Sequence, residues 1–405
     1  MSKTGEAGRS GPKVRSDCRI VVEYCDKGGL LLDISSKVGP MYGDNIRQQI
    51  TESCANLGIE NARVTVEDRG ALPFVLDARL ETAARRADPT LDATLIPEMR
   101  KHCTYTSKAD RLRRSRLYLP GNEPKFFVNA GLHNPDGMIL DLEDSVAHSE
   151  KDAARCMVRN ALRVVDFYGA ERMVRINQGE MGIADLDWIV PHNVHLILIP
   201  KVEDPQQVID VDNRIKEILK ENNIEQSVFL MPIIESALGA WKAYEIAASC
   251  ESVVSLAIGL EDYTADIGTQ RTLEGGESFW ARAQVLNGAV AAGVQPIDTV
   301  FSDVGDEEGL RNSIIEAKSF GFVGKGCIHP RQIDVVHKTF APETAELEKA
   351  KKIVLAFEDA ESKGLGVVSL GSKMIDAPVV KRALRTVDVA IQVGMLNAEW
   401  RKEVD

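Results

Sequence analysis

The spacing of hydrophobic and polar residues divides the chain into segments of different character. Near the start, apolar and β-branched runs at 19–24 and 30–34 flank a short turn, which predicts a β-hairpin. Residues 44–57 predict a helix with Asp44 as its N-cap, and 63–66 (RVTV) predict another strand. The apolar face of that helix carries Ile46, Ile50, Cys54 and Leu57. Together these elements predict a small α+β domain of about 70 residues, a size at which a domain is only marginally stable alone.

From residue 115 onward, short apolar runs alternate with amphipathic helical stretches, which predicts parallel βα units. The runs are 116–119, 138–142, 173–176, 194–199, 228–233, 254–258, 296–301 and 321–328. The helical stretches include 151–165, 205–220, 238–249, 281–292 and 307–320. Eight units over about 220 residues predict a (β/α)8 TIM barrel. A doubly wound open sheet is the alternative, but LPGNEP at 119–124 lacks the GxGxxG turn that such a sheet more often carries after its first strand.

The fold class is therefore α/β: a TIM barrel with a C-terminal lid, preceded by a small α+β domain. We expect the small domain at 1–87, a linker without periodicity at 88–112, the barrel at 113–340 and a helical lid segment at 341–405. Within that last segment, helical patterns at 344–363 and 379–393 flank a glycine-rich loop or hairpin at 364–378. Glycine-rich segments added to a barrel are candidates for lids or subunit contacts.

Composition excludes several classes of function. The 405 residues are 44% hydrophobic and 27% charged, which is typical of a globular protein, and the formal charge of −12 disfavours binding to nucleic acid or an anionic membrane. No apolar run reaches the ~18 residues of a membrane span, and the polar start lacks the apolar stretch of a signal peptide. The seven cysteines are scattered without a CxxC pair, which favours reduced thiols in a cytoplasm.

Charged residues gather where the barrel strands are predicted to end, and a TIM barrel carries its active site at that face. Any one of them is as well explained by a helix cap or a solvated loop, but their recurrence around one rim favours a site. Several carboxylates with an arginine suggest a hard cation such as Mg²⁺ and an anionic substrate. The residues are Asp141, Glu143, Asp144, Arg175, Asn177, Lys201, Glu203, Asp204, Glu235, Glu261, Asp262, Asp298, Asp303, Lys325 and His329.

Other chemistries have weaker support in the sequence. Lys201 is a candidate Schiff-base lysine, although the neighbouring Glu203 and Asp204 favour its charged form. His329 is either a packing residue or a catalyst, and without a second histidine at ligand spacing it does not predict a zinc site. No GxSxG motif points to a hydrolase.

Residues 114–378 resemble the citrate lyase β-subunit and malyl-CoA lyase group of the HpcH/HpaI aldolase family. The motifs that carry the resemblance occur in order along the barrel. They are RSRLYLPGN (114–122), PDGMILDLEDSV (135–146), VRIN (174–177), IPKVED (199–204), PIIESALG (232–239), GLEDYTADIG (259–268) and GFVGKGCIHPRQI (321–333).

The resemblance implies a Mg²⁺ held by Glu235 and Asp262, with Arg175 on the substrate carboxylate and Asp144 in a supporting position. The stretch GSKMIDAP (371–378) looks like the family's lid, which implies that Asp376 is an acid/base residue acting on a neighbouring subunit of a homotrimer or hexamer. We also expect Arg116 and Lys325 to contact the substrate.

The front domain resembles the acyl carrier (γ) subunit of citrate lyase through YGDNIRQQI (42–50) and DRGALPFVLDARLETAARRA (68–87). Such carriers usually have two serines before an aspartate, and the first holds a CoA-derived prosthetic group. Here the stretch is VRSD, with Arg15 at the first position and Ser16 at the second. Either Ser16 carries the group or the domain is unmodified and structural.

The implied reaction cleaves a carbon–carbon bond of a 3-hydroxy-acyl thioester, giving an acetyl-type thioester and a 2-oxo acid. The handle is CoA or a CoA-derived prosthetic group, and citryl, malyl and citramalyl thioesters all remain open as substrates. Two alternatives remain: a Schiff-base aldolase, and a non-catalytic carrier or assembly protein of a citrate lyase complex.

Overall fold

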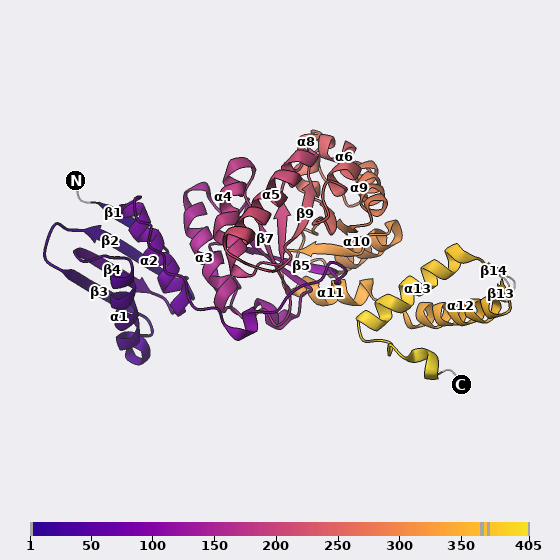
Figure 1. Ribbon diagram of the computed structural model, residues 1–405, viewed down its shortest axis with the longest axis horizontal. Helices are drawn as coiled ribbons and strands as arrows, with labels where there is room; N and C mark the ends of the chain where they lie inside the picture. Colours follow the sequence, from indigo (N-terminus) through magenta and orange to yellow (C-terminus); the bar gives the residue numbers. More distant parts are fainter. Residues whose placement is uncertain (1–2, 365–367, 371–372, 404–405) are drawn as a thin grey trace.

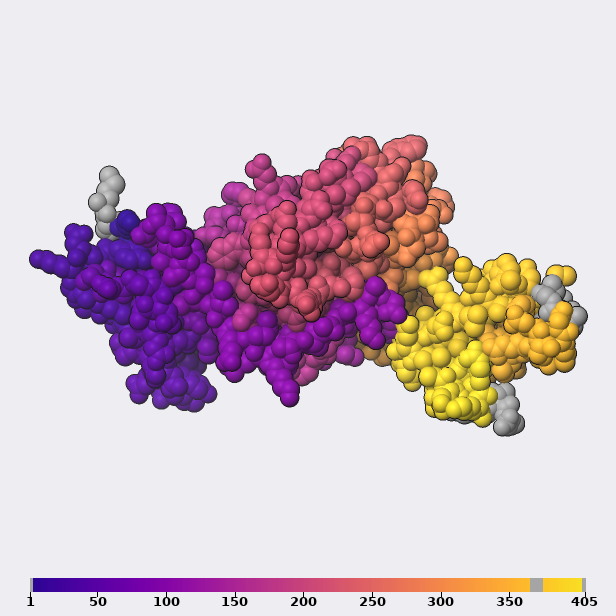
Figure 2. Space-filling model, viewed as in Figure 1, coloured from indigo at the N-terminus to yellow at the C-terminus, as the bar shows by residue number. Residues whose placement is uncertain are grey.

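The computed structural model describes residues 3–364, 368–370 and 373–403. In chain order these residues form an N-terminal α+β domain, a closed barrel and a helical hairpin (Figure 1). The first and last units lie at opposite ends of the molecule with the barrel between them (Figure 2). Gly371 and Ser372 of the predicted lid lie outside the described residues. Within the described ranges, no helix is both long and apolar enough to cross a membrane.

The N-terminal domain is a four-stranded sheet in the order β1-β2-β4-β3, covered by two helices. The predicted hairpin is wrong, because β2 and β3 both pair with β4, antiparallel and parallel respectively, so that β4 lies between them. The parallel pair is joined through α1, which buries Ile46, Ile50 and Cys54 against the sheet. The elements are β1 (Thr4–Gly8), β2 (Cys18–Tyr24), β3 (Leu30–Ser36), α1 (Gly39–Asn56), β4 (Ala62–Asp68) and α2 (Pro73–Ala87).

Helix α1 begins five residues earlier than the sequence pattern indicates. It starts at Gly39, with Pro40 in its first turn, so Asp44 lies inside the helix and does not cap it. Proline suits the first turn because its fixed φ fits the helix and the N–H it lacks has no partner there. The predicted buried face is confirmed, since Ile46, Ile50 and Leu57 are all buried.

All eight predicted barrel strands are confirmed, and they close in the parallel order β10-β11-β12-β5-β6-β7-β8-β9. The strands are β5 (Ser115–Pro120), β6 (Gly137–Asp141), β7 (Glu171–Arg175), β8 (Leu196–Ile199), β9 (Phe229–Ile234), β10 (Ser255–Ile258), β11 (Gln295–Asp298) and β12 (Gly324–Cys327). The helices are α3 (Lys151–Val164), α4 (Gly179–Ile189), α5 (Pro205–Glu221), α6 (Ala237–Trp241), α7 (Ala243–Ala247), α8 (Leu260–Asp266), α9 (Phe279–Ala292), α10 (Glu307–Phe320) and α11 (Arg331–Phe340). The stretch at 238–249 is thus two short helices, and α4, α8 and α11 were not predicted.

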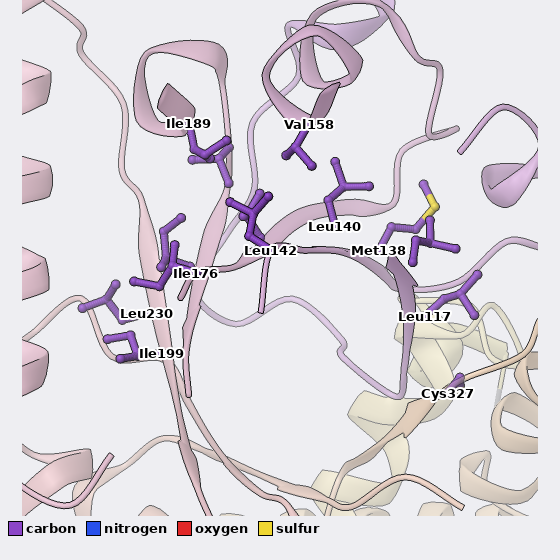
Figure 3. Packing of buried hydrophobic residues seen from close by; sticks show 14 of the residues in the cluster. Leu117, Met138, Leu140, Leu142, Val158, Ile176, Ile189, Ile199, Leu230 and Cys327 are labelled. Carbon is purple, nitrogen blue, oxygen red and sulfur yellow. The ribbon is translucent and has the colours of Figure 1, made fainter. Parts of the chain in front are cut away.

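The barrel strands are apolar on both faces because both faces are buried. Outward side chains pack against the helices: in Figure 3, Leu140 and Leu142 point toward Val158 of α3 and Ile189 of α4. Inward side chains fill the barrel, among them Ile139, Met173, Leu198, Met231 and Ile297. This double packing holds the strand ends, and any side chains they carry, in fixed positions.

The two outer units are held in different ways. In the N-terminal domain, Glu81 forms a buried ion pair with Arg159 of the barrel, and Arg79 pairs with Asp17 while donating to the Asn122 carbonyl. The C-terminal unit consists of α12 (Thr344–Ser362), β13 (Val368–Leu370), β14 (Lys373–Ile375) and α13 (Ala377–Gln392). Its helices pack on each other around their own apolar cluster, which includes Val354, Val380 and Val387.

Candidate active site

A cavity of about 370 Å³ opens at the C-terminal ends of the barrel strands. Strands β5, β6, β7, β9, β10, β11 and β12, or the loops directly after them, contribute to its wall. Its charged lining residues are Arg116, Asp141, Asp144, Arg175, Glu235, Glu261, Asp262 and Asp298. The structure therefore brings most of the predicted site residues together in one place.

Arg175 is fixed by two carboxylates at the rim. It ends β7 in register with Asp141 of β6, to which its Nε and Nη2 donate at 2.7 and 2.8 Å, while its Nη1 lies 2.8 Å from Glu143. Burial alone would raise the pKa of Asp141, but the hydrogen bonds and charge of Arg175 hold it below its usual range. The remaining N–H donors of Nη1 and Nη2 are available to an anionic ligand, for which the flat guanidinium is well suited.

Tyr118 is a lining residue that the sequence analysis missed. The Arg175 guanidinium lies over its ring, 5.3 Å from the centroid. Side chains alternate along a strand, so Tyr118 faces the same side of β5 as Arg116, two residues earlier. The two-residue spacing from Arg116 is the sequence signal from which Tyr118 could have been predicted.

Glu235 and Asp262 come from neighbouring strand ends. Glu235 directly follows β9, and Asp262 lies in the first turn of α8, just after β10. Only 6% of Glu235 is exposed, and its Oε2 accepts a hydrogen bond from the Lys201 backbone N–H at 2.8 Å. Burial raises the pKa of Glu235 to about 7, and the negative charges of Asp262 and Glu143 act in the same direction. The carboxyl group thus sits in a site that favours a cation.

This pair suits a hard divalent cation. Both side chains offer carboxylate oxygens, and the described residues contain no group of three or more histidine, cysteine, aspartate or glutamate side chains arranged to hold a metal. Two carboxylates would leave the other coordination positions of such a cation to water and substrate oxygens. That pattern is typical of Mg²⁺, which keeps several waters and is bound through one or two carboxylates.

Lys201 lies between these groups. Its Nζ is 3.3, 3.4 and 3.5 Å from carboxylate oxygens of Glu143, Asp144 and Asp262. Its backbone is left-handed, with φ of 50°, a conformation that non-glycine residues adopt mainly at functional sites or turns. Burial acts against the ammonium, yet the three carboxylates raise the pKa of Lys201. Since a Schiff base needs the free amine, this environment disfavours the aldolase alternative.

Arg116 and Lys325, the two other basic residues expected to contact the substrate, lie in different environments. Arg116 is 1% exposed at the floor of the cavity, and within the described part of the chain its guanidinium donates hydrogen bonds to the Met231 sulfur and the Asp298 carbonyl. Lys325 does not line this cavity. Lys325 stands two residues before Cys327, whose side chain packs between the strands and the helices. Lys325 therefore faces the helices as well, and its Nζ donates to Asp298 at 2.6 Å.

The remaining candidates lie outside the cavity or at its edge. Asp376 caps α13 in the C-terminal hairpin, where its side chain accepts from the Val379 N–H, and it does not line the cavity of its own chain. The Asp144 side chain is 52% exposed at the rim. The Nδ1 atom of His329 accepts a hydrogen bond from the Arg331 N–H at the start of α11, as a local turn residue would.

Three family profiles match the chain. One described as HpcH/HpaI aldolase/citrate lyase covers residues 114–330, and one described as a carbon–carbon bond lyase of the TIM-barrel fold covers 278–391. A third, described as the malonate decarboxylase delta subunit, covers residues 8–87.

Individual relatives agree with these profiles. Citrate lyase subunit beta of Haemophilus influenzae is 42% identical over 67% of this chain and 95% of that protein. The mitochondrial citramalyl-CoA lyase of Homo sapiens is 32% identical over 69% of this chain and 86% of that protein. The crystal structure of protein CitE from Mycobacterium tuberculosis with magnesium, acetoacetate and coenzyme A matches with a TM-score of 0.58 and 30% identity, over 69% of this chain and 98% of that one.

Proposed function

The chain belongs to the HpcH/HpaI aldolase/citrate lyase family and is a carbon–carbon lyase; from this premise we propose that it is a Mg²⁺-dependent lyase of 3-hydroxy-acyl thioesters. The products are an acetyl-type thioester and a 2-oxo acid. The observation that carries the proposal is the convergence of Glu235, Asp262 and Arg175 on one cavity. Two carboxylates for a hard cation and a guanidinium for a carboxylate are the groups that such a substrate requires.

Each residue has a role that follows from its position. Glu235 and Asp262 would hold Mg²⁺, which would supply stabilisation of the negative charge on the substrate's hydroxyl oxygen when that oxygen loses its proton. Arg175 binds the substrate carboxylate, and Asp141 and Glu143 fix the orientation of its guanidinium. Asp144, next to Lys201 at the rim, supports the charge arrangement around the site.

Cleavage begins with loss of the substrate's hydroxyl proton and leaves an enolate thioester, whose carbon then needs a proton. We assign both transfers to Asp376 of a neighbouring subunit in a homotrimer or hexamer: its carboxylate accepts the hydroxyl proton, and the resulting carboxylic acid donates a proton to the enolate carbon. The hairpin that carries Asp376 has its own apolar core and forms a lobe beyond the barrel, which supports a reach to another copy (Figure 2). Such a lid also excludes water from the enolate.

Subunit mixing tests this assignment. Glu235→Gln and Asp376→Asn homo-oligomers are both expected to be inactive. Co-assembled from the two variants, the mixed oligomers should regain activity, because some sites then combine an intact Glu235 with an intact Asp376. Absence of any recovery in confirmed mixed oligomers would contradict action in trans.

The front domain serves this reaction as a fixed, unmodified unit in our proposal, and free CoA is the substrate's handle. The buried Arg159–Glu81 ion pair and the hydrogen bond from Arg79 to the Asn122 carbonyl both join the domain to the barrel, and they support a domain that stays docked. A cytoplasmic location is part of the proposal, and the seven free thiols support it.

Intact mass of the purified protein tests whether the front domain is unmodified. A mass equal to that of the bare chain is expected, and an added prosthetic group at Ser16 would contradict the proposal.

The reaction itself is tested with a panel of citryl-, citramalyl- and malyl-CoA. Turnover should require Mg²⁺ and disappear on chelation. Glu235→Ala or Asp262→Ala should abolish it while the circular dichroism spectrum and thermal unfolding stay native-like. The matched control is Glu203→Ala, which removes a partly buried carboxylate on the loop after β8 that does not line the cavity, and this variant should retain activity. Full activity of either ligand variant in the presence of chelator would refute the metal assignment.

A further inference from the structure

Arg116 is a buried cation without a carboxylate partner. It lies on β5 with 1% of its surface exposed, and no ion pair of the described residues includes it. Its Nη1 donates to the Met231 sulfur at 3.2 Å and its Nη2 to the Asp298 backbone oxygen at 3.4 Å, while Nε has no hydrogen-bond partner. A thioether and a distant carbonyl compensate poorly for the water that a guanidinium gives up on burial.

The position of this charge gives it a function. Arg116 lines the same cavity as Arg175, Glu235 and Asp262. Arg116 lies four residues before the end of β5, whereas Arg175 is the last residue of β7. The two arginines therefore lie at different depths of the barrel. The cavity thus presents one guanidinium at its rim, already oriented by Asp141, and a second at its floor with donors unused.

From this geometry we infer that Arg116 binds a second free carboxylate of the substrate, and so selects acyl thioesters that carry two free carboxylates. The inference rests on the proposed lyase function and narrows its substrate to the citryl type, whose 2-oxo acid product is dicarboxylic. The second carboxylate of a citryl thioester is on a carboxymethyl group. A citramalyl thioester has a methyl group at this position, and a malyl thioester has a hydrogen atom. Either would leave the Arg116 charge buried and unpaired.

A site built to pair with a polar group rejects an analogue that lacks it far more strongly than an apolar pocket rejects a missing methylene. With Mg²⁺ present, the wild-type enzyme should therefore show kcat/KM for citryl-CoA at least about a hundredfold above that for citramalyl-CoA. Arg116→Met replaces the guanidinium by an apolar side chain of similar length. It should lower kcat/KM for citryl-CoA about a hundredfold and change that for citramalyl-CoA less than about threefold.

The matched control is Arg114→Met, the same substitution just before the same strand. Arg114 pairs with Asp136 at the opposite end of the barrel from the cavity, so this variant should retain the wild-type preference. Arg116→Lys keeps the charge without the planar fork and should show an intermediate preference. It also serves as the test variant if Arg116→Met fails to fold.

A binding measurement separates this inference from the reaction. Calorimetric titration in Mg²⁺ should show oxaloacetate binding at least about tenfold tighter than pyruvate, and Arg116→Met should remove the difference. Equal losses for all three thioesters in Arg116→Met, or a wild-type preference for citramalyl- or malyl-CoA, would overturn the inference while leaving the lyase function standing. Failure of the wild type to cleave any thioester would instead refute the proposed function.

Discussion

Two neighbouring cavities of the barrel each contain buried basic side chains, but these differ in whether they have a counter-ion. The central cavity has a volume of about 370 Å³, and an outer cavity of about 470 Å³ lies between the strands and helices α9 and α10. The walls of both include Asp298 and Thr299. In the outer cavity, Asp298 binds both Lys325 and Arg282, whereas in the central cavity no ion pair among the described residues includes Arg116, and its Nε has no hydrogen-bond partner. Burial of a cation therefore does not by itself mark a ligand site, because the buried charges of Lys325 and Arg282 are already paired with Asp298.

The largest predicted effect on stability comes from removing the Asp298 carboxylate in the outer cavity. Asp298→Asn leaves Lys325 and Arg282 buried without their shared carboxylate, and breaking a buried pair in this way costs about 3–5 kcal/mol. The free energy of unfolding, measured by urea denaturation, should fall by that amount. Asp303→Asn, an exposed carboxylate on the wall of the same cavity, is the control and should change it by less than about 0.5 kcal/mol. A loss below about 1 kcal/mol for Asp298→Asn would show that the pair is not a structural element.

The difference between the cavities also shows how far the sequence can be interpreted. The eight strands were predictable because each is an apolar run whose ends are marked by polar residues. The same reading placed Glu235, Asp262 and Arg175 at strand ends, which the structure confirms as their positions. The direction of a side chain at a strand end was not predictable where the run is buried on both faces, because such a run shows no alternation.

Lys325 illustrates that limit. It lies within the eighth predicted strand (321–328) and was expected to contact the substrate, but its side chain points outward, toward Asp298 and the helices. The wrongly predicted hairpin has a similar cause. A short turn between two apolar runs favours a hairpin locally, yet β4 pairs with β2 on one edge and with β3 on the other and so separates them.

A second prediction contrasts the two cations directly. Lys325→Met removes one partner of Asp298 and should lower the free energy of unfolding by about 1–3 kcal/mol. Arg116→Met removes a charge that has no counter-ion and should leave that energy unchanged or raise it by about 1 kcal/mol. Chemical denaturation of both variants without substrate measures the two effects. Destabilisation of similar size in both would break the contrast between the cavities.

A third prediction concerns two glycines, one in each cavity. A Cβ at Gly259 would lie 2.6 Å from Glu235 Oε1, so Gly259→Ala must displace that carboxylate. A shift of this kind in a catalytic group should lower kcat about tenfold, while stability stays close to that of the wild type. Gly275 of the outer cavity has φ of +65° and no side-chain or backbone atom closer than 3.7 Å to its Cβ position.

Gly275→Ala is thus the matched control for Gly259→Ala. Its left-handed backbone should cost about 1 kcal/mol of stability without altering kcat. Steady-state kinetics combined with thermal unfolding separates the two outcomes. If both alanine variants lost activity equally, the close approach of Gly259 to Glu235 would have no particular role in catalysis.

The smallest predicted effect concerns Lys201, whose ammonium lies beside the proposed metal ligand Asp262. It contacts Asp262, one of the proposed metal ligands, as well as Glu143 and Asp144. An arriving Mg²⁺ must compete with this ammonium for the Asp262 carboxylate. Lys201→Met should therefore raise the affinity for Mg²⁺ several-fold, about 1 kcal/mol by calorimetric titration.

The sign of this change discriminates between two roles for the lysine. If the ammonium mainly holds the carboxylates in place for the metal, its loss would weaken Mg²⁺ binding; if it mainly acts as the counter-ion of the metal-free site, its loss strengthens binding. We expect the second outcome, because a divalent cation attracts the same three carboxylates more strongly than the ammonium does. Lys242→Met removes a partly exposed lysine that pairs with Asp204 outside the cavity, and it should leave the affinity unchanged. Weaker Mg²⁺ binding by Lys201→Met would mean that the central cavity, like the outer one, depends on a resident cation for its structure.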